Sequence, residues 1–339
     1  MPEDAASTRV VRDDLFDLLF IYTEEPVHCG VGQGLGAIDQ PIQREVHTDF
    51  PVIYGSGIRG SLREALGPLN GDATKLFGSE PPGKGSTESG GTDDRRTYPG
   101  ALSPHDARLV LFPVQALASG FAWITCPLAL SVLWRNLLLA DADPSADTTR
   151  AEHRWTVMDS IDSGKCLLTG SSTLAVDGAV VLRDHAFKPA RPGDGTAQPT
   201  TDRLANWLSD CAFPTGDEYS YWRSSLAERL VVLSDSDFTF FVQTATEVNT
   251  RVRLENKVVA TGALWVEEAI PPEALLFSPM AACTRHQRVS DTEERDVTAS
   301  EALTAAHTLI GTLKRITLGG TESIGRGRVC LRWLKGGEQ

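Results

Sequence analysis

Residues Leu15 to Tyr22 read LFDLLFIY, a nearly continuous apolar run without glycine or proline. Such a run is typical of a buried central strand, because a strand with one face in water would alternate polar and apolar side chains. The remaining chain must cover this strand. A chain of 339 residues with a hydrophobic fraction of 41% can bury a sizeable core, as one elaborated domain or two.

A polar, turn-rich loop follows this strand. Four glycines stand there at every second position, so the backbone can lie close against a ligand or take positive φ values at little steric cost. They are Gly30, Gly32, Gly34 and Gly36. His28 opens the loop and Asp39 closes it. Residues 56–66 then predict a helix with Ser56 as N-cap, and the N–H groups of its first turn suit a phosphate.

Four standard interpretations of this glycine loop fail. It lacks the G-K-[ST] of a P-loop, and its G-x-G-x-x-A is followed by Asp39 and Pro41 where a dinucleotide-binding helix should begin. It contains neither a G-x-S-x-G nucleophile elbow nor an H-E-x-x-H metal helix. By elimination, the loop holds a backbone or a phosphate-bearing chain, or it is only a turn.

The residues alone leave a structural interpretation open for each polar side chain. A single aspartate such as Asp39 commonly turns or caps the chain, and a single histidine such as His28 commonly fills a structural site. Arg59 and Arg63 are equally well explained as solvated helix charges.

The rest of the chain alternates regular segments with insertions. Segments at about 78–100 and 188–201 are rich in glycine, proline and polar residues and are expected to be flexible insertions. Residues 246–268 alternate around an Asn-Lys turn, which predicts a β-hairpin. Other strands are expected at 108–116, 120–126, 174–187 and 328–333, and helices at 127–140, 203–211, 218–232 and 300–314, the last capped by Ser300. This order predicts an α+β fold with a ferredoxin-like (RRM-like) core and extended loops.

Charge and cysteine content narrow the function classes. A net charge of −13 argues against general nucleic-acid binding, although the region from Gly311 onward is locally basic. The six cysteines form no C-x-x-C pair, which argues against a zinc knuckle or a disulfide framework. No apolar run is long enough to span a membrane and the N-terminus lacks a signal-peptide core, so we expect a cytoplasmic protein without a membrane partner.

Four stretches carry a family resemblance. Residues 26–63, which include the glycine loop, resemble the signature of the backbone subunit of type III-B CRISPR effectors, the fourth-named Cmr subunit, in the RAMP superfamily. Stretches similar to that family follow in order at 103–127, 234–272 and 319–333. The last contains GGTESIGRG, which carries the G-x-x-x-x-x-G-x-G loop typical of RAMP proteins. Together they cover well over half of the chain.

The resemblance implies a single elaborated RAMP domain over 1–339 with a β-hairpin thumb, formed by 246–268 or by the 188–201 insertion. It implies a subunit that polymerises along a CRISPR guide RNA, contacting further copies of itself in a helical filament and other Cmr subunits. In this family the paired target RNA is cleaved at six-nucleotide intervals. Cleavage requires a divalent metal, expected to be Mg²⁺, and leaves a cyclic or 3′-phosphate and a 5′-hydroxyl.

The same resemblance implies roles for individual residues. Asp39 matches the catalytic aspartate, which holds or orients the metal or helps activate the attacking 2′-hydroxyl. His28 matches a histidine beside the cut phosphate. Glu267 matches an accessory acid, although its expected aromatic neighbour is Ala269 here. The residues expected to bind RNA are Arg44, His47, Ser56, Gly57, Arg59, Arg63, Gly319, Gly320, Thr321 and Arg326, with Arg251 and Arg253 near the hairpin as additional candidates.

Two rival functions are left open. If Asp39 only turns its loop, the chain is a guide-binding filament subunit that does not cleave. Alternatively, it is a stand-alone metabolic enzyme that binds a nucleotide in the glycine loop. Copurifying RNA of tens of nucleotides would favour the filament, and tight mononucleotide binding by the monomer would favour the metabolic enzyme.

Overall fold

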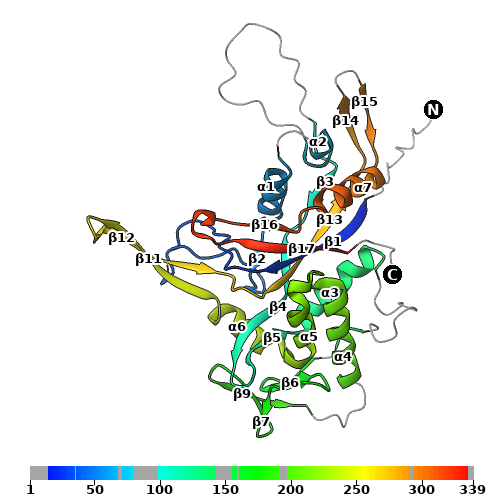
Figure 1. The fold of residues 1–339 in the computed structure, drawn as a ribbon. Helices are drawn as coiled ribbons and strands as arrows, with labels where there is room; N and C mark the ends of the chain where they lie inside the picture. The colour runs from blue at the N-terminus through cyan, green and yellow to red at the C-terminus, as the bar shows by residue number, and fades with distance from the viewer. Residues whose placement is uncertain are drawn as a thin grey trace, which may run out of the picture.

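The computed structural model describes residues 14–34, 36–67, 71–78, 98–142, 155–158, 160–190, 197–290 and 293–334. Its centre is a mixed sheet with the strand order β16-β17-β1-β13-β4-β5-β10-β6-β9-β8-β7 (Figure 1). The apolar run forms β1 (Leu15–Thr23), which lies inside the sheet between β17 (Arg328–Leu334) and β13 (Leu275–Ala282) and is antiparallel to both. The predicted central strand is therefore confirmed.

Strand β1 is buried on both faces, as its apolar run predicts. Leu18, Phe20 and Tyr22 pack into one core cluster, whereas Leu19 and Ile21 point the other way into a second cluster. Successive side chains of a strand alternate between faces, so both faces of this strand must be covered.

Helices supply the two covering layers (Figure 1). The layer over Leu19 and Ile21 contains α1 (Gly55–Leu66), α2 (Gly71–Phe77) and α7 (Ala299–Ile310). The opposite layer contains α3 (Pro127–Leu139), α4 (Ala197–Trp207), its π-helical continuation Leu208–Ala212, and α5 (Ser220–Arg229). A further helix, α6 (Asp235–Thr244), packs Phe238, Phe241 and Val242 into the first cluster.

Strand β4 (Ala107–Ala116) links the two halves of the sheet, since it pairs antiparallel with β13 and then with β5 (Gly120–Thr125). Its hairpin with β5 and the following helix α3 match the sequence prediction. The shorter strands are β2 (Val52–Ile53), β3 (Leu102–Pro104), β6 (Lys165–Leu168), β7 (Ala175–Val176), β8 (Ala179–Leu182), β9 (His185–Pro189), β10 (Leu230–Leu233) and β16 (Arg315–Thr317).

Two hairpins stand apart from the main sheet. Strands β11 (Glu247–Glu255) and β12 (Val258–Ala269) occupy the predicted hairpin and extend away from the body (Figure 1). Their turn residues Asn256 and Lys257 both have positive φ, as a tight hairpin turn requires. The other hairpin, of β14 (Arg285–Ser290) and β15 (Glu293–Val297), is not predicted by the sequence.

Three local predictions are wrong. The N-cap of α1 is Tyr54 rather than Ser56, which lies inside the helix. The N-cap of α7 is Thr298 rather than Ser300, because Thr298 and Glu301 form a reciprocal capping box. The helix predicted at 218–232 ends at Arg229, where the chain enters β10 and pairs with β5 in the buried sheet.

The two expected insertions are described only in part. Residues 79–97 and 191–196, the centres of these insertions, lie outside the described residues. Residues from 197 onward belong to α4, so the second segment reaches into a helix. All six cysteines are free, and five of them are buried, as expected for ordinary thiols. Across the described ranges, we find no helix with the length and apolar character needed to cross a bilayer.

Candidate functional site

The two glycine loops meet although they lie at opposite ends of the sequence. The backbone N–H of Gly320 donates to the carbonyl of His28 at 2.9 Å. A Cβ at Gly319, whose φ is 80°, would lie 2.3 Å from that same carbonyl, so only glycine allows this approach. Together the loops border a pocket of about 590 Å³, which is also lined by Gln33, Gln40, Gln43 and the helix residue Gly57.

His28 lines this pocket, and the protein holds one of its two ring nitrogens. Its Nδ1 lies 2.6 Å from the carbonyl oxygen of Glu268. A carbonyl oxygen can only accept a hydrogen bond, so Nδ1 carries the proton and Nε2 has the lone pair when the ring is neutral. The side chain of His28 packs over Gly30, where a Cβ would lie 2.7 Å from Nε2. The geometry leaves Nε2 to exchange a proton with a ligand in the pocket.

Asp39 lies on the exposed part of the first loop, next to the pocket residue Gln40. Its Oδ2 accepts a hydrogen bond from the backbone N–H of Val266 in β12 at 2.7 Å. Its own carbonyl accepts from Gly34 N–H at 2.8 Å, which closes the glycine loop. Within the described ranges, Oδ1 has no hydrogen-bond partner. The carboxylate is therefore oriented by the hairpin but remains open to solvent.

Asp39 fits a Mg²⁺ ion only in one mode. Among the described residues, no cluster of three or more His, Cys, Asp or Glu side chains could enclose a metal. Mg²⁺ is commonly held by one or two carboxylates, with waters and substrate phosphate oxygens as the other ligands. An exposed carboxylate with one unpartnered oxygen suits that mode, in which the RNA would bring its own ligands.

Glu267 occupies a different environment from the one expected of an accessory acid. Its side chain is only 2% exposed, and its Oε1 lies 3.3 Å from Arg251 Nη2 and 3.5 Å from Arg326 Nη1. Arg326 also pairs with Glu247 at 3.0 Å. This partly buried cluster joins the hairpin base to the second glycine loop, and its placement favours a structural role for Glu267 and for both arginines.

Glu268 is a buried residue that the sequence analysis did not identify. Its Oε1 accepts from Arg44 Nη2 at 2.6 Å and from Thr246 Oγ1 at 2.8 Å, while its Oε2 accepts from Ile42 N–H at 3.1 Å. The Arg44 guanidinium is therefore already paired inside the protein, and its side chain is only 16% exposed. The only sequence signal was the paired acids Glu267 and Glu268 at the end of an alternating strand.

The start of α1 is exposed, as expected for a phosphate-binding helix start, but some of its polar groups are already bonded inside the protein. Ser56, Gly57 and Arg59 are exposed, although the Arg59 guanidinium also donates to the Phe77 carbonyl. The Gly55 N–H is already occupied, since it donates to Asp106 Oδ1 at 2.8 Å.

The other residues expected to bind RNA lie on the surface or in the second glycine loop. Arg63 is half-buried, and His47 is exposed with its Nε2 3.8 Å from Glu45 Oε2. Thr321 has a left-handed φ of 67° and its hydroxyl donates to Gly320. Arg253 pairs with Glu255 near the hairpin turn.

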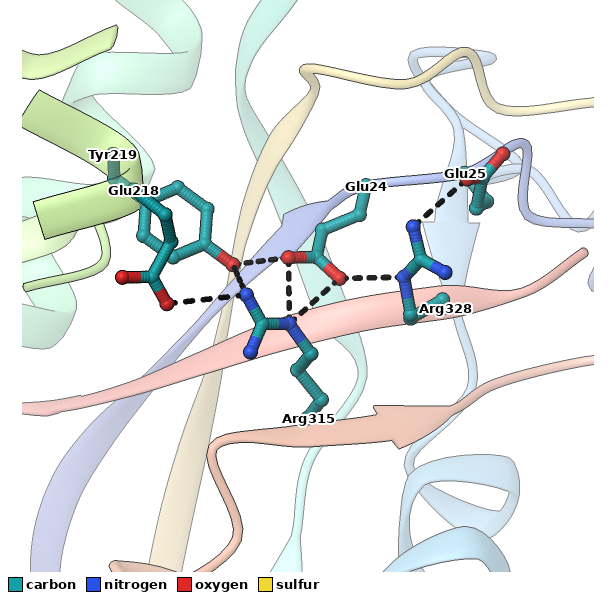
Figure 2. Close-up of polar contacts among 6 residues, drawn as sticks. All are labelled: Glu24, Glu25, Glu218, Tyr219, Arg315 and Arg328. Carbon is teal, nitrogen blue, oxygen red and sulfur yellow. Dashed lines mark hydrogen bonds and ion pairs between the residues drawn. The ribbon is translucent and has the colours of Figure 1, made fainter. Parts of the chain in front are cut away.

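A second polar cluster, whose residues are not part of the pocket lining, joins the ends of three strands (Figure 2). The Glu24 carboxylate accepts from Arg315 and Arg328 at 2.8 Å each, and from the Tyr219 hydroxyl. Burial raises the pKa of Glu24, but these three hydrogen bonds outweigh it and hold the pKa below its ordinary value. Because Glu24 directly follows β1 and the arginines belong to β16 and β17, the cluster ties these strand ends together.

Comparisons with known proteins agree with this architecture. A sequence profile of the RAMP superfamily matches residues 20–330. The CRISPR system Cmr endoribonuclease Cmr4 of Pyrococcus furiosus is 29% identical over 320 residues, covering 92% of this chain and 93% of the relative. The CRISPR system CMR subunit Cmr4 of Saccharolobus solfataricus is 23% identical over 337 residues, covering 93% of this chain and 95% of that protein.

Solved structures share the fold. The structure of oligomeric Cmr4 from Pyrococcus furiosus superposes with a TM-score of 0.63 at 23% identity, covering 94% of this chain and 97% of that one. A chain of the type III-B Cmr-beta complex bound to cognate target RNA also superposes with a TM-score of 0.63, at 18% identity over the same shares of the two chains.

Proposed function

The chain belongs to the RAMP superfamily, and from this premise we propose that it is the backbone subunit of a type III-B CRISPR (Cmr) effector complex that cleaves target RNA. The match to a Cmr endoribonuclease over more than nine-tenths of both chains supports the activity. The likeness to a subunit of a complex bound to cognate target RNA supports the substrate. One observation carries the proposal: His28, whose Nε2 has no hydrogen-bond partner among the described residues, lines a pocket built by both glycine loops, and Asp39 directly precedes the pocket residue Gln40.

The finer architecture follows the family. Strands β1, β4, β13 and β17 with helices α1 and α7 form the ferredoxin-like core of a single elaborated RAMP domain. The β17-β1-β13-β4 order, antiparallel throughout, supports this assignment. The β11–β12 hairpin is the thumb. Its apolar side chains support this role, since Leu254, Val258 and Leu264 are each more than half exposed and can lie against unpaired bases.

The guide RNA is bound through its backbone at the two glycine loops and the start of α1. Glycine-rich backbone can lie close to phosphates without reading their sequence. At the start of α1, the exposed Ser56 hydroxyl and Arg59 guanidinium can donate to a phosphate, whereas the N–H groups of Gly55 and Gly57 already donate to Asp106 and Tyr54. Further copies of the chain bind successive segments of the guide in a helical filament, with other Cmr subunits at its ends. Base pairing between guide and target provides the sequence recognition. The complex acts in the cytoplasm, where transcripts are found.

Cleavage places a distorted target phosphate between His28 and Asp39. The target 2′-hydroxyl attacks the adjacent phosphorus, the bond from phosphorus to the 5′-oxygen breaks, and a cyclic phosphate and a 5′-hydroxyl result. His28 Nε2 can accept the 2′-hydroxyl proton or, once protonated, donate one to the leaving oxygen. Asp39 would hold a Mg²⁺ ion on one side of the reacting phosphate, and that ion would stabilise the negative charge that develops there.

Replacing Asp39 tests this function. We expect Asp39→Ala to abolish cleavage of a complementary RNA by the assembled complex while guide and target binding stay nearly intact. Asp39→Asn should also abolish it, because the amide oxygen still accepts from Val266 but the negative charge is gone. Single-turnover cleavage and filter binding measure the two properties, and Asp162→Asn, an exposed residue in a distant loop, is the matched control.

The alternatives make different predictions. If the wild-type complex does not cleave a complementary RNA, the non-catalytic filament subunit is the better description. Cleavage that survives both Asp39 variants would overturn the proposed role of Asp39. Loss of assembly in both variants would make Asp39 a structural residue. We expect His28→Ala to slow cleavage less severely than Asp39→Ala.

A further inference from the structure

Strand β12 contacts the candidate site with one edge and its hairpin partner β11 with the other. Its inner edge pairs with β11, with Thr250 opposite Val266 and Val248 opposite Glu268. Its outer edge, between Val266 and Ile270, faces the first glycine loop rather than solvent.

The hydrogen-bonding groups of this outer edge are all used. Every N–H and C=O of Val266, Glu268 and Ile270 has a partner in the segment 27–40. In order along the strand, the partners are Asp39 Oδ2 (2.7 Å), Gln40 N (3.0 Å), Gln40 O (3.0 Å), His28 Nδ1 (2.6 Å), Val27 O (2.9 Å) and Val27 N (2.9 Å).

The two candidate catalytic side chains are thus held by one strand. Asp39 is bound at Val266 and His28 at Glu268, two residues further along. Residues two apart in a strand present their backbone groups to the same edge and lie about 6.7 Å apart. The repeat of β12 therefore sets the separation of the two anchoring points.

The buried carboxylate of Glu268 fastens this edge to the rest of the protein. It is 3% exposed and accepts three hydrogen bonds, from Arg44, Thr246 and Ile42. Arg44 in turn donates to the carbonyls of Asp49 and Val242. One side chain thus connects the glycine-loop segment, the entry to β11 and the end of α6.

Building on the proposed function, we infer that β12 positions His28 and Asp39 as one unit and that Glu268 is the positioning residue holding this unit together. The Glu268 side chain contacts neither catalytic candidate and acts through the strand. Movement of the hairpin as it engages the target RNA consequently moves both side chains together, which couples cleavage to the position of the hairpin.

Glu268→Gln tests the inference in the guide-loaded complex. The amide keeps an acceptor for the neighbouring donors but loses the ion pair with Arg44. We expect the single-turnover cleavage rate to fall about tenfold or more while target affinity stays within about twofold, because small displacements of reacting groups are costly. Glu24→Gln is the matched control, since it also removes a partly buried carboxylate with three donors but lies off β12 (Figure 2). It should cleave at close to the wild-type rate.

A spectroscopic readout separates positioning from simple loss of stability. Selective ¹⁵N-histidine NMR of the free subunit should show His28 as the Nδ1–H tautomer in the wild type and in Glu24→Gln. In Glu268→Gln, that signature should be lost or exchange-broadened. Retention of the tautomer together with a wild-type cleavage rate would overturn the inference.

If Glu268→Gln fails to fold, a second variant tests the inference instead. Thr246→Val removes one hydroxyl donor to Glu268 and keeps the shape of the side chain. Slower cleavage by Thr246→Val at unchanged thermal stability would support the inference, and cleavage at the wild-type rate would contradict it. These results are independent of the Asp39 test. If Asp39→Ala still cleaves, the proposed function fails, whereas the tautomer experiment continues to test whether β12 positions His28.

Discussion

The carboxylates of this protein differ in burial and in charge state, depending on the groups that each one contacts. Asp39 is exposed and hydrogen-bonded once, whereas Glu267 and Glu268 are buried beside arginines. Glu273 is half-buried, follows β12, and accepts from the Tyr22 hydroxyl without any cation within ion-pair distance in the described residues. Burial raises the pKa of Glu273 to about 7. The acid is consequently neutral in the folded protein under conditions where it is ionised in the unfolded chain.

This environment predicts a pH-dependent stability difference at Glu273. A raised pKa in the folded state contributes stability that is fully present below the unfolded pKa of about 4.3 and is lost as the pH rises through about 7. Glu273→Gln cannot ionise and still accepts from Tyr22. We expect the wild type to lose stability relative to this variant between pH 5 and pH 8, by at most about 3 kcal/mol. Denaturant unfolding at both pH values measures the difference, and parallel pH profiles would contradict the raised pKa.

Helix starts are the elements for which local sequence was most misleading. Both predicted caps were serines, yet Tyr54 precedes α1 and Thr298 caps α7. In α7, Thr298 Oγ1 accepts from Glu301 N–H at 3.2 Å, and Glu301 Oε2 accepts from Thr298 N–H at 2.9 Å. The serine predicted as the cap, Ser300, is the second residue of α7, where its hydroxyl does not cap the helix.

Cap substitutions at α7 check this element. We expect Thr298→Ala to lower the free energy of unfolding by about 1 kcal/mol, because an orphan N–H of the first turn loses its acceptor. Ser300→Ala, on an exposed helical position, should be neutral or slightly stabilising. Urea denaturation of the two variants gives the comparison. An equal loss in both would mean that the capping box contributes nothing.

At the scale of the whole molecule, an acidic chain must bind a polyanion with few available cations. The net charge is −13, and three arginines that the sequence offered for RNA are paired internally with glutamates. They are Arg44, Arg251 and Arg326. Arg59 is exposed and pairs with no carboxylate among the described residues. Under the proposed function, we therefore expect phosphate contacts from those N–H groups of the glycine loops that the protein leaves unbonded. Gly34 and Gly320 are not among them, since they donate to the carbonyls of Asp39 and His28.

Salt dependence of guide binding tests this division. We expect a shallow slope per subunit, and Arg59→Ala should weaken binding and reduce the slope by about one further charge. Arg203→Ala, on the opposite helical layer, is the control. Binding measured across a series of salt concentrations gives the slopes. An unchanged slope in Arg59→Ala would remove this residue from the RNA surface.

Local sequence patterns are enough to predict four features: the buried strand β1, the two glycine loops, the strand pair before α3 and the long hairpin. Each is written in a continuous pattern of apolar, turn or glycine residues, and local backbone preferences suffice to read it. The resemblance of residues 26–63 added His28 and Asp39, which the structure brings to one strand edge.

Which charged groups remain available to a ligand depends on contacts that form only when the chain folds. Nothing around Arg44, Arg326 or Glu267 distinguishes a surface charge from a buried one, because their partners come from residues far away in the sequence. The same holds for β10, where a helical pattern continues until pairing with β5 in the core makes a strand more favourable. Ion pairing and sheet pairing depend on which groups folding brings within a few ångströms of one another, and no local pattern contains that distance.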